Sequence, residues 1–162
     1  MTDIIYRAAN EDDFSGLAAM YEKLNAYFYQ VGYLLPHPEN VGDVWVESFR
    51  RTLGRFSNVF VAEGEGHLLG FILCRLKRLP AYMGGLMVGE VSDVWVEGEA
   101  RRSGVGQALV QSGVEWMRGQ GVHSVEVQVL GGNEGSLRFF ESLGFKLELR
   151  ALRLLNTDKG EG

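Results

Sequence analysis

Four stretches of the chain carry apolar residues at the spacing of an amphipathic helix. They span residues 10–28, 41–53, 105–119 and 134–143. Asn10 is a typical N-cap residue, and the acidic residues after it suit the positive end of a helix dipole. Gly144 follows the last stretch, as a C-cap glycine does. The pattern therefore predicts four helices.

Segments between these helices have the composition and turn boundaries of strands. They span residues 4–7, 58–63, 68–76, 86–96 and 122–130, and 145–155 is a last extended segment. A turn at 63–66 makes a hairpin of the second and third strands, and Gly89 interrupts the fourth. This order predicts a mixed sheet with helices on its faces, an α/β or α+β domain. We expect residues 1–155 to form a single domain, with a polar tail at 156–162.

Composition narrows the classes of partner. Hydrophobic residues make up 46% of the 162 residues and charged residues 23%, which is typical of a globular protein. The formal net charge is -5 and the pI about 5.2. Nucleic-acid binding needs a basic footprint, so we expect no nucleic-acid partner. A small cationic partner, such as an amine, suits an acidic surface better.

The cysteine, the histidines and the N-terminus argue against disulfides, metal sites and secretion. Cys74 is the only cysteine, so an internal disulfide is impossible, and its apolar neighbours indicate a buried position. The three histidines lack metal-ligand spacing, so we expect no metal. The N-terminus lacks the pattern of a signal peptide, and no apolar run approaches the roughly 20 residues that span a bilayer. We expect a cytoplasmic protein that does not enter a membrane.

The most informative segment is the glycine-bearing turn at 101–106, which joins a strand to a helix. Helix N-termini present N–H groups without intrahelical partners and partial positive charge, so they bind phosphate. Gly104 and Gly106 let the backbone approach an anion, and Arg101 and Arg102 add charge. The alternative is an ordinary helix start with two solvated arginines. A Rossmann site fits poorly because Leu109 replaces the third glycine, and no Walker motif occurs.

Two landmarks resemble the GCN5-related N-acetyltransferase (GNAT) family. Arg101-Arg102-Ser103-Gly104-Val105-Gly106 is similar to its R/Q-x-x-G-x-G/A pyrophosphate loop. Asn133, a short helix with an aromatic pair, and then Leu143-Gly144-Phe145 are similar to its second landmark. The resemblance covers about residues 4–155 and implies a mostly antiparallel central sheet with helices on both faces.

The resemblance implies acetyl-CoA as cosubstrate and assigns residues to its binding. Backbone amides within 102–106 would bind the pyrophosphate, and the strand segment 93–96 would pair with the pantetheine arm. One backbone N–H of that strand would polarise the acetyl carbonyl. Asn133 would lie near the coenzyme, unless it is only a loop or cap residue. The expected cofactor-binding residues are Val94, Trp95, Val96, Arg101, Arg102, Ser103, Gly104, Val105, Gly106, Asn133, Ser136 and Phe140.

The resemblance also implies direct attack of an amine in a ternary complex. An alkyl ammonium must first lose its proton, so a general base is needed. Glu90 occupies the matching position, eleven before Arg101, and strand alternation places it on one face with Ser92, Val94 and Val96. A bulge would change that alternation, and Glu90 is otherwise an exposed edge glutamate. Asp93 and Glu97 are the weaker alternatives.

One departure concerns the proton donor to the departing thiolate. Many members have Tyr where this chain has Phe140, which we interpret as core or as a wall against the thioether. Tyr82, Tyr33 or Tyr29 could replace it, or the thiolate could leave unaided. The aromatic segments 27–39 and 78–85 are expected to line the acceptor pocket, unless they form core or a contact in a homodimer. Transfer of another acyl group and a non-catalytic coenzyme-binding module remain the alternatives.

Overall fold

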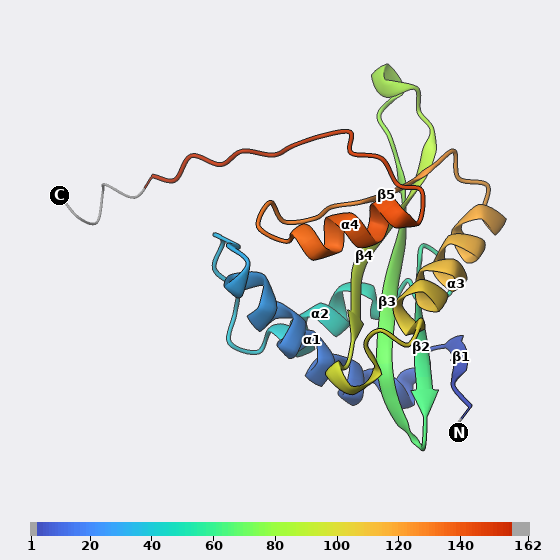
Figure 1. The fold of residues 1–162 in the computed structure, drawn as a ribbon. Helices are drawn as coiled ribbons and strands as arrows, with labels where there is room; N and C mark the ends of the chain where they lie inside the picture. The colour runs from blue at the N-terminus through green and yellow to red at the C-terminus, as the bar shows by residue number, and fades with distance from the viewer. Residues whose placement is uncertain (1–2, 157–162) are drawn as a thin grey trace.

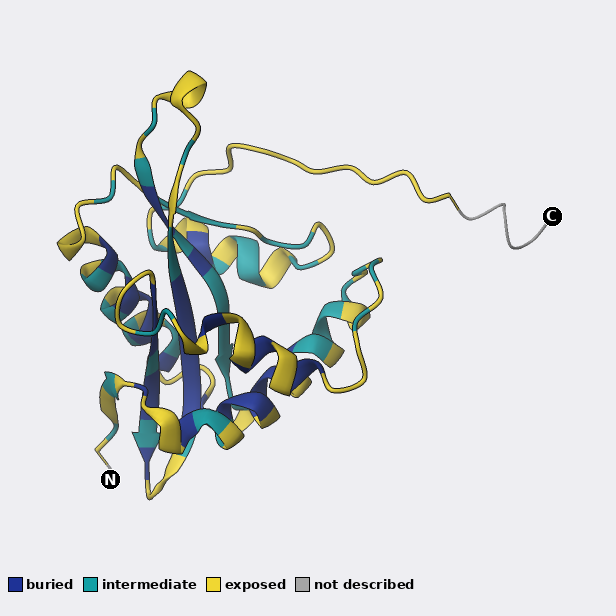
Figure 2. Ribbon diagram, turned by 180° about the vertical axis from the view of Figure 1, so that it is seen from behind, coloured by how far each residue is buried: buried dark blue, intermediate teal, exposed yellow. Residues whose placement is uncertain are grey.

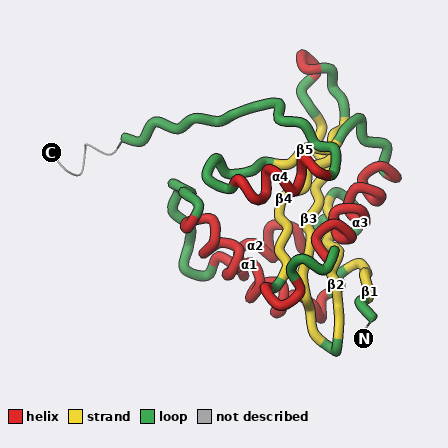
Figure 3. Tube along the Cα trace, viewed as in Figure 1, coloured by secondary structure: helices red, strands yellow, loops and turns green. Residues whose placement is uncertain are grey.

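A computed structural model describes residues 3–156. Its centre is a five-stranded sheet in the order β1-β2-β3-β4-β5 (Figures 1 and 3). The first four strands pair antiparallel, and β5 pairs parallel to β4. The strands are β1 (Ile5–Ala8), β2 (Ser57–Gly64), β3 (His67–Arg78), β4 (Met87–Val96) and β5 (Val125–Val127).

Helices cover both faces of this sheet, which confirms the predicted fold class (Figure 1). They are α1 (Phe14–Gln30), α2 (Val41–Arg50), α3 (Val105–Gly119) and α4 (Glu134–Ser142). Short 3-10 helices lie at Glu11–Asp13, Ala81–Met83 and Gly98–Ala100. Within residues 3–156, we find no helix with the length and apolarity that a membrane crossing requires.

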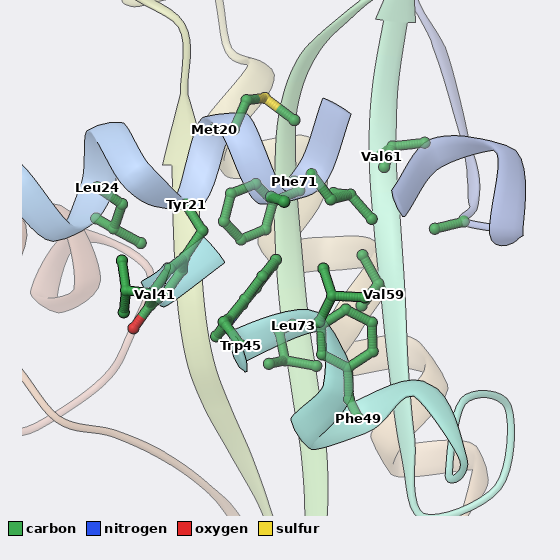
Figure 4. Packing of buried hydrophobic residues seen from close by; sticks show 14 residues of the cluster. Met20, Tyr21, Leu24, Val41, Trp45, Phe49, Val59, Val61, Phe71 and Leu73 are labelled. Carbon is green, nitrogen blue, oxygen red and sulfur yellow. The ribbon is translucent and has the colours of Figure 1, made fainter. Parts of the chain in front are cut away.

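One face of the sheet packs against α1 and α2. Phe71 and Leu73 of β3 project from the sheet into this layer, where Trp45 lies 5.0 Å from Phe71 between ring centroids (Figure 4). Tyr21 stacks on Trp45 at 4.5 Å. Phe49 of α2 is fully buried there. This core anchors the two helices that lie beside β4.

The opposite face packs against α3 and α4. The alternate residues of β3, Ile72 and Cys74, belong to this second core. Gly113 lets α3 approach the sheet, because a Cβ there would lie 2.6 Å from Cys74 Sγ. Gly89 has a similar role, since a Cβ there would lie 2.5 Å from Met117 Sδ. Gly89 therefore allows close helix packing and does not interrupt the strand.

The elements differ from the predicted ones mainly at their ends. The predicted strand at 122–130 is only three residues long, and the first predicted helix begins as a 3-10 turn. The second predicted helix ends at Arg50, before Leu53. Residues 145–155 are extended, as predicted, but pair with no strand in the described part of the chain. Of the predicted tail only Asn156 is described, and 157–162 lie outside the described residues.

Candidate active site

The strands β4 and β5 part in the middle of the sheet. Their ladder covers only Gly89↔Val125, Glu90↔Glu126 and Val91↔Val127. β4 then continues to Val96 without a neighbour on that side among the described residues. Unpaired strand edges bind extended ligands through main-chain hydrogen bonds. The predicted pantetheine segment, residues 93–96, lies along this open edge.

The loop after β4 has a backbone conformation suited to an anion. Arg102 has φ 65° and Gly104, the N-cap of α3, has φ 85°, so both lie in the left-handed region. Left-handed residues next to a helix start turn successive N–H groups toward one point, a nest for anions. No atom lies within 4 Å of a Cβ built on Gly104, so the space beside it is open.

The amides of this loop are free to bind a ligand. Within the described chain, the backbone N–H groups of residues 102–107 donate to no acceptor, and the first helical hydrogen bond is Ala108 N–H to Gly104 O. Such unpaired N–H groups at a helix start form an anion site. Ser103 Oγ donates instead to Ala100 O at 2.5 Å, which holds the turn before the helix.

The two arginines of the loop take different positions. Arg101 Nε donates to Val96 O at 2.9 Å, and its guanidinium lies 4.6 Å from the Trp95 ring centroid. Arg101 therefore bridges the end of β4 to the loop, with a cation–π contact. Arg102 is exposed. Its left-handed φ is unusual for a residue with a Cβ.

Side chains on β4 alternate between the two cores. Val94 and Val96 pack against the α3 and α4 layer, and Val105 is buried there. Gly106 approaches Phe139 of α4, because a Cβ there would lie 3.4 Å from the Phe139 ring. Trp95 faces α1, and its Nε1 is buried with no hydrogen-bond partner in residues 3–156. A buried donor without a partner is unusual in a folded protein.

The second landmark lies across the opening from β4. Asn133 Oδ1 accepts from Ser136 N at 3.1 Å, so Asn133 is the N-cap of α4. Tyr27 of α1 donates from its hydroxyl to the same oxygen at 3.4 Å. Gly132 touches Val31, since a Cβ there would lie 2.3 Å from Val31 O. The end of α1 thus closes against the 131–133 loop.

Phe140 lies in the core between Phe139 and Phe145. It is buried, with ring centroids 5.1 Å and 5.3 Å from these neighbours in edge-on geometry. The packing fits our interpretation of Phe140 as core. Ser136, another expected binding residue, donates its backbone N–H to Asn133 Oδ1 as part of the α4 cap.

Glu90 lies on the α1 and α2 side of the sheet. Its cross-strand partner Arg75 hydrogen-bonds Ser48 of α2 at 2.8 Å. Ser92 Oγ donates to Glu90 Oε1 at 2.8 Å, and Lys77 Nζ lies 3.6 Å from Oε2. These contacts hold the carboxylate on the sheet surface near the point where β4 and β5 part.

The predicted alternation along β4 is wrong. The ladder with β3 shifts between Leu73 and Cys74, so Ser92 is an extra residue on β4, a β-bulge. Glu90 and Ser92 therefore share a face with Asp93, while Val94 lies on the opposite face. The bulge brings two carboxylates to one side.

Asp93, one of the two weaker alternatives to Glu90, is held by a tryptophan of α2. Trp45 Nε1 donates to Asp93 Oδ2 at 2.9 Å. The pKa of Asp93 is raised to about 7, mainly because the carboxyl is desolvated; the Trp45 hydrogen bond and Arg75 lower the pKa, and the nearby Glu90 raises it. Nothing in the sequence indicates that Trp45 of α2 lies next to Asp93. Glu97, the other alternative, pairs with Lys23 of α1 at 2.9 Å.

The three tyrosines named for the proton donor make contacts outside β4. Tyr29 donates to Leu35 O at 2.7 Å and packs with Tyr33 and His37 in the loop after α1. Tyr82 is 88% exposed at the tip of the β3–β4 connection, which projects beyond the body (Figure 1). Among the tyrosines that the structure describes, Tyr27 is the one that hydrogen-bonds Asn133. No group of three or more metal-ligating side chains occurs in the described residues.

Known proteins are similar to this chain in sequence and in fold. The acetyltransferase (GNAT) family matches residues 17–145. A glucosamine 6-phosphate N-acetyltransferase from Trypanosoma brucei brucei is 30% identical over 160 residues, which cover 95% of this chain and 99% of that protein. A mycothiol acetyltransferase from Amycolatopsis mediterranei is 32% identical over 114 residues, or 67% of this chain and 38% of its own length.

Solved structures of acetyltransferases have a similar fold. An acetyltransferase from Trypanosoma brucei aligns with a TM-score of 0.70 at 26% identity, over 94% of this chain and 99% of that one. An aminoglycoside N-acetyltransferase in complex with CoA aligns with a TM-score of 0.78 at 16% identity, over 97% of each chain, a likeness of fold alone. Together with the free loop amides, the family match identifies the chain as a member of the acetyltransferase (GNAT) family and an acyl-CoA-dependent acetyltransferase.

Proposed function

We propose that this enzyme moves the acetyl group of acetyl-CoA to a primary amine of a small molecule, by direct attack in a ternary complex. The observation that carries the proposal is the set of unpaired backbone N–H groups at 102–107, beside the open edge of β4. The relatives named above for glucosamine 6-phosphate, mycothiol and aminoglycosides support a small-molecule amine as the acceptor.

The loop and β4 would hold the cosubstrate along its length. The nest formed around Arg102 and Gly104 takes the diphosphate, with Arg102 as a mobile counter-charge. The unpaired edge of β4 takes the amide groups of the pantetheine arm as an added strand does.

Glu90 is the proposed general base. Glu90 takes one proton from the ammonium, the amine nitrogen bonds to the acetyl carbon, and the C–S bond breaks. The second proton that the nitrogen loses goes to the departing thiolate, so that CoA leaves as the thiol. Glu90 lies on the same side of β4 as Asp93, whose carboxyl accepts a hydrogen bond from Trp45 of α2. Ser92 and Lys77 orient the Glu90 carboxylate.

Tyr27 is the proposed proton donor to the thiolate, in place of the hydroxyl absent at Phe140. Its ring lies 6.4 Å from Trp95 and its hydroxyl reaches Asn133, so it spans the opening between β4 and α4. A thiol with a pKa near 8.5 needs only modest assistance to leave. The contribution of Tyr27 is therefore smaller than that of Glu90.

Glu90→Gln tests the base, and Glu126→Gln is the matched control. Both glutamates contact Lys77, and they are cross-strand neighbours. Thiol release from acetyl-CoA is measured with amino sugars, including glucosamine 6-phosphate, and with aminoglycosides. We expect Glu90→Gln to lower kcat at neutral pH by about 10²-fold. Acetyl-CoA affinity stays the same, and Glu126→Gln stays near wild type. Equal losses in both variants would assign the effect to Lys77 and overturn the proposal for Glu90.

A further inference from the structure

Lys77 places an amine of the protein itself beside the proposed general base. Its Nζ lies 3.6 Å from Glu90 Oε2 and also contacts Glu126 Oε1. Lys77 belongs to β3, Glu90 to β4 and Glu126 to β5, so the lysine side chain crosses β4 to reach the third strand. Among the lysines that the structure describes, Lys77 is the one in contact with Glu90.

This amine is accessible and lies where the sheet opens. β3 is buried through its middle and becomes exposed toward Arg78, at the end that carries Lys77 (Figure 2). The side chains of Lys77 and Glu90 are 42% and 24% exposed. The β4–β5 ladder ends at Val91↔Val127, one residue past Glu90. The Lys77 amine therefore lies beside the start of the open edge of β4.

The distances of the transfer reaction place an acceptor nitrogen in the same region. An acceptor amine hydrogen-bonds its base at roughly 2.6–3.2 Å. It approaches the carbon that it attacks to roughly 3–3.5 Å. With Glu90 as the base, the acetyl carbon therefore lies within about 7 Å of its carboxylate. Lys77 Nζ, on a flexible aliphatic stem, lies within reach of both groups.

The Lys77 ammonium needs the same activation as an external amine. Its pKa is raised, first by the hydrogen bond to Glu126 and also by Glu90, while desolvation lowers it. Lys77 is therefore charged at neutral pH, and its nitrogen has no free electron pair until a base removes a proton. Glu90 is in contact with this ammonium and is the group that we assign as the base.

We propose that the enzyme acetylates its own Lys77 when it holds acetyl-CoA without an acceptor. Lys77 Nζ bonds to the acetyl carbon and the C–S bond breaks. One proton passes from Nζ to Glu90 and a second goes to the departing thiolate, so the products are acetyl-lysine and the CoA thiol. The inference rests on the proposed function, because it uses the same donor and base. Acetylation removes the charge that contacts Glu90 and Glu126.

Intact mass and peptide mapping of the full chain after incubation with acetyl-CoA alone test the inference. We expect one added acetyl group, on Lys77. Lys23 is the matched control, because it is also ion-paired with a glutamate, Glu97, and its side chain is more exposed at 57%. Unassisted reaction with acetyl-CoA in solution would therefore modify Lys23 at least as fast. Equal or greater acetylation of Lys23 would overturn the proposal.

The two carboxylates that contact Lys77 should have opposite effects on this modification. At saturating acetyl-CoA, Glu90→Gln should slow it by at least about 10-fold, because the base is lost. Glu126→Gln should speed it, because the amide holds the ammonium less strongly than the carboxylate does. Equal slowing in both variants would contradict the role of Glu90. The rate should also be independent of enzyme concentration, and a rate that rises with concentration would show transfer between molecules and contradict transfer within one chain.

Thiol release with the amino sugars and aminoglycosides separates this inference from the proposed function. Acetylation of an added amine while Lys77 stays unmodified would overturn the inference and leave the proposed function intact. Acetylation of Lys77 without thiol release for any added amine would overturn the proposed small-molecule acceptor and leave Lys77 as the acceptor.

Discussion

Trp45 Nε1 donates to Asp93 Oδ2 at 2.9 Å, which joins α2 to β4 immediately after the bulge at Ser92. The hydrogen bond spans elements far apart in sequence and satisfies a carboxyl group in the interior. Tyr21 stacks on the other side of the same indole, and its own burial raises the pKa of the Tyr21 hydroxyl. The position of the second carboxylate in the site therefore depends on α2.

Asp93 makes stability depend on pH. Its pKa is raised to about 7 in the fold, above the value near 3.9 of an unfolded Asp. The stability that the neutral carboxyl contributes is complete below about pH 4 and is lost as pH rises through 7. Asp93→Asn stays neutral and keeps an acceptor for Trp45. We expect the variant to exceed wild type in stability by a margin that grows from pH 4 to 8, up to roughly 4 kcal/mol.

Urea unfolding at pH 4, 6 and 8 measures this margin. Asp43→Asn, at an exposed position on α2, serves as the control for the same substitution away from the strand. A difference between Asp93→Asn and wild type that does not change with pH would show that the carboxyl is ionised in the fold.

Gly104→Leu is expected to weaken acetyl-CoA binding by at least about 10-fold. A side chain there occupies the open space of the nest, and its left-handed φ costs about 1–2 kcal/mol in addition. Gly121→Leu is the matched control, because Gly121 also has a left-handed φ, 82°, and open space, at the other end of α3. Isothermal titration compares the variants. Equal binding by both would place the diphosphate elsewhere.

Tyr27→Phe tests the proposed proton donor. We expect kcat to fall by about 10-fold, with little change in the KM for acetyl-CoA, because one acid is lost from the departure of the thiolate. The melting temperature should change little, since the lost contact to Asn133 is long at 3.4 Å. A normal kcat would remove Tyr27 from the chemistry, and a normal kcat with a large drop in melting temperature would leave it a structural role.

Gly113→Ala should destabilise the fold although alanine favours a helix. Its Cβ would lie 2.6 Å from Cys74 Sγ, and overpacking of a core costs about 1–3 kcal/mol. Cys74→Ala combined with Gly113→Ala removes the clash, so the double variant should lose less than the sum of the two singles. Gly119→Ala, with open space around its Cβ, is the control and should be neutral or stabilising. Additive losses measured by urea unfolding would contradict the close contact.

The two loop landmarks and the helix layers could be predicted because they are local. Helical spacing and glycines at turns determine α3 and the 101–106 loop within a short window. The bulge at Ser92 could not be predicted in this way. It arises from the pairing register of β4 with β3, which the sequence of neither strand shows by itself. Alternation counted along β4 therefore placed Glu90 with Val94, and the structure places it with Asp93.

Strand length shows a similar limit. Residues 122–130 have a composition rich in valine, yet only Val125–Val127 pair, because β4 and β5 part after Val91. Propensity indicates which residues suit a sheet but not where a partner is present. Residues 145–155 show the same limit, since the predicted extended segment pairs with no strand in the described part of the chain. The division into a domain at 1–155 and a tail stays a prediction.

The most direct measurement of the central claim is amide NMR of the loop during titration with CoA. We expect the N–H signals of residues 102–107, which donate to no acceptor in the described chain, to shift on binding, and to shift more than those at the opposite end of α3. Binding that leaves these signals unmoved, or no binding at millimolar CoA, would contradict it.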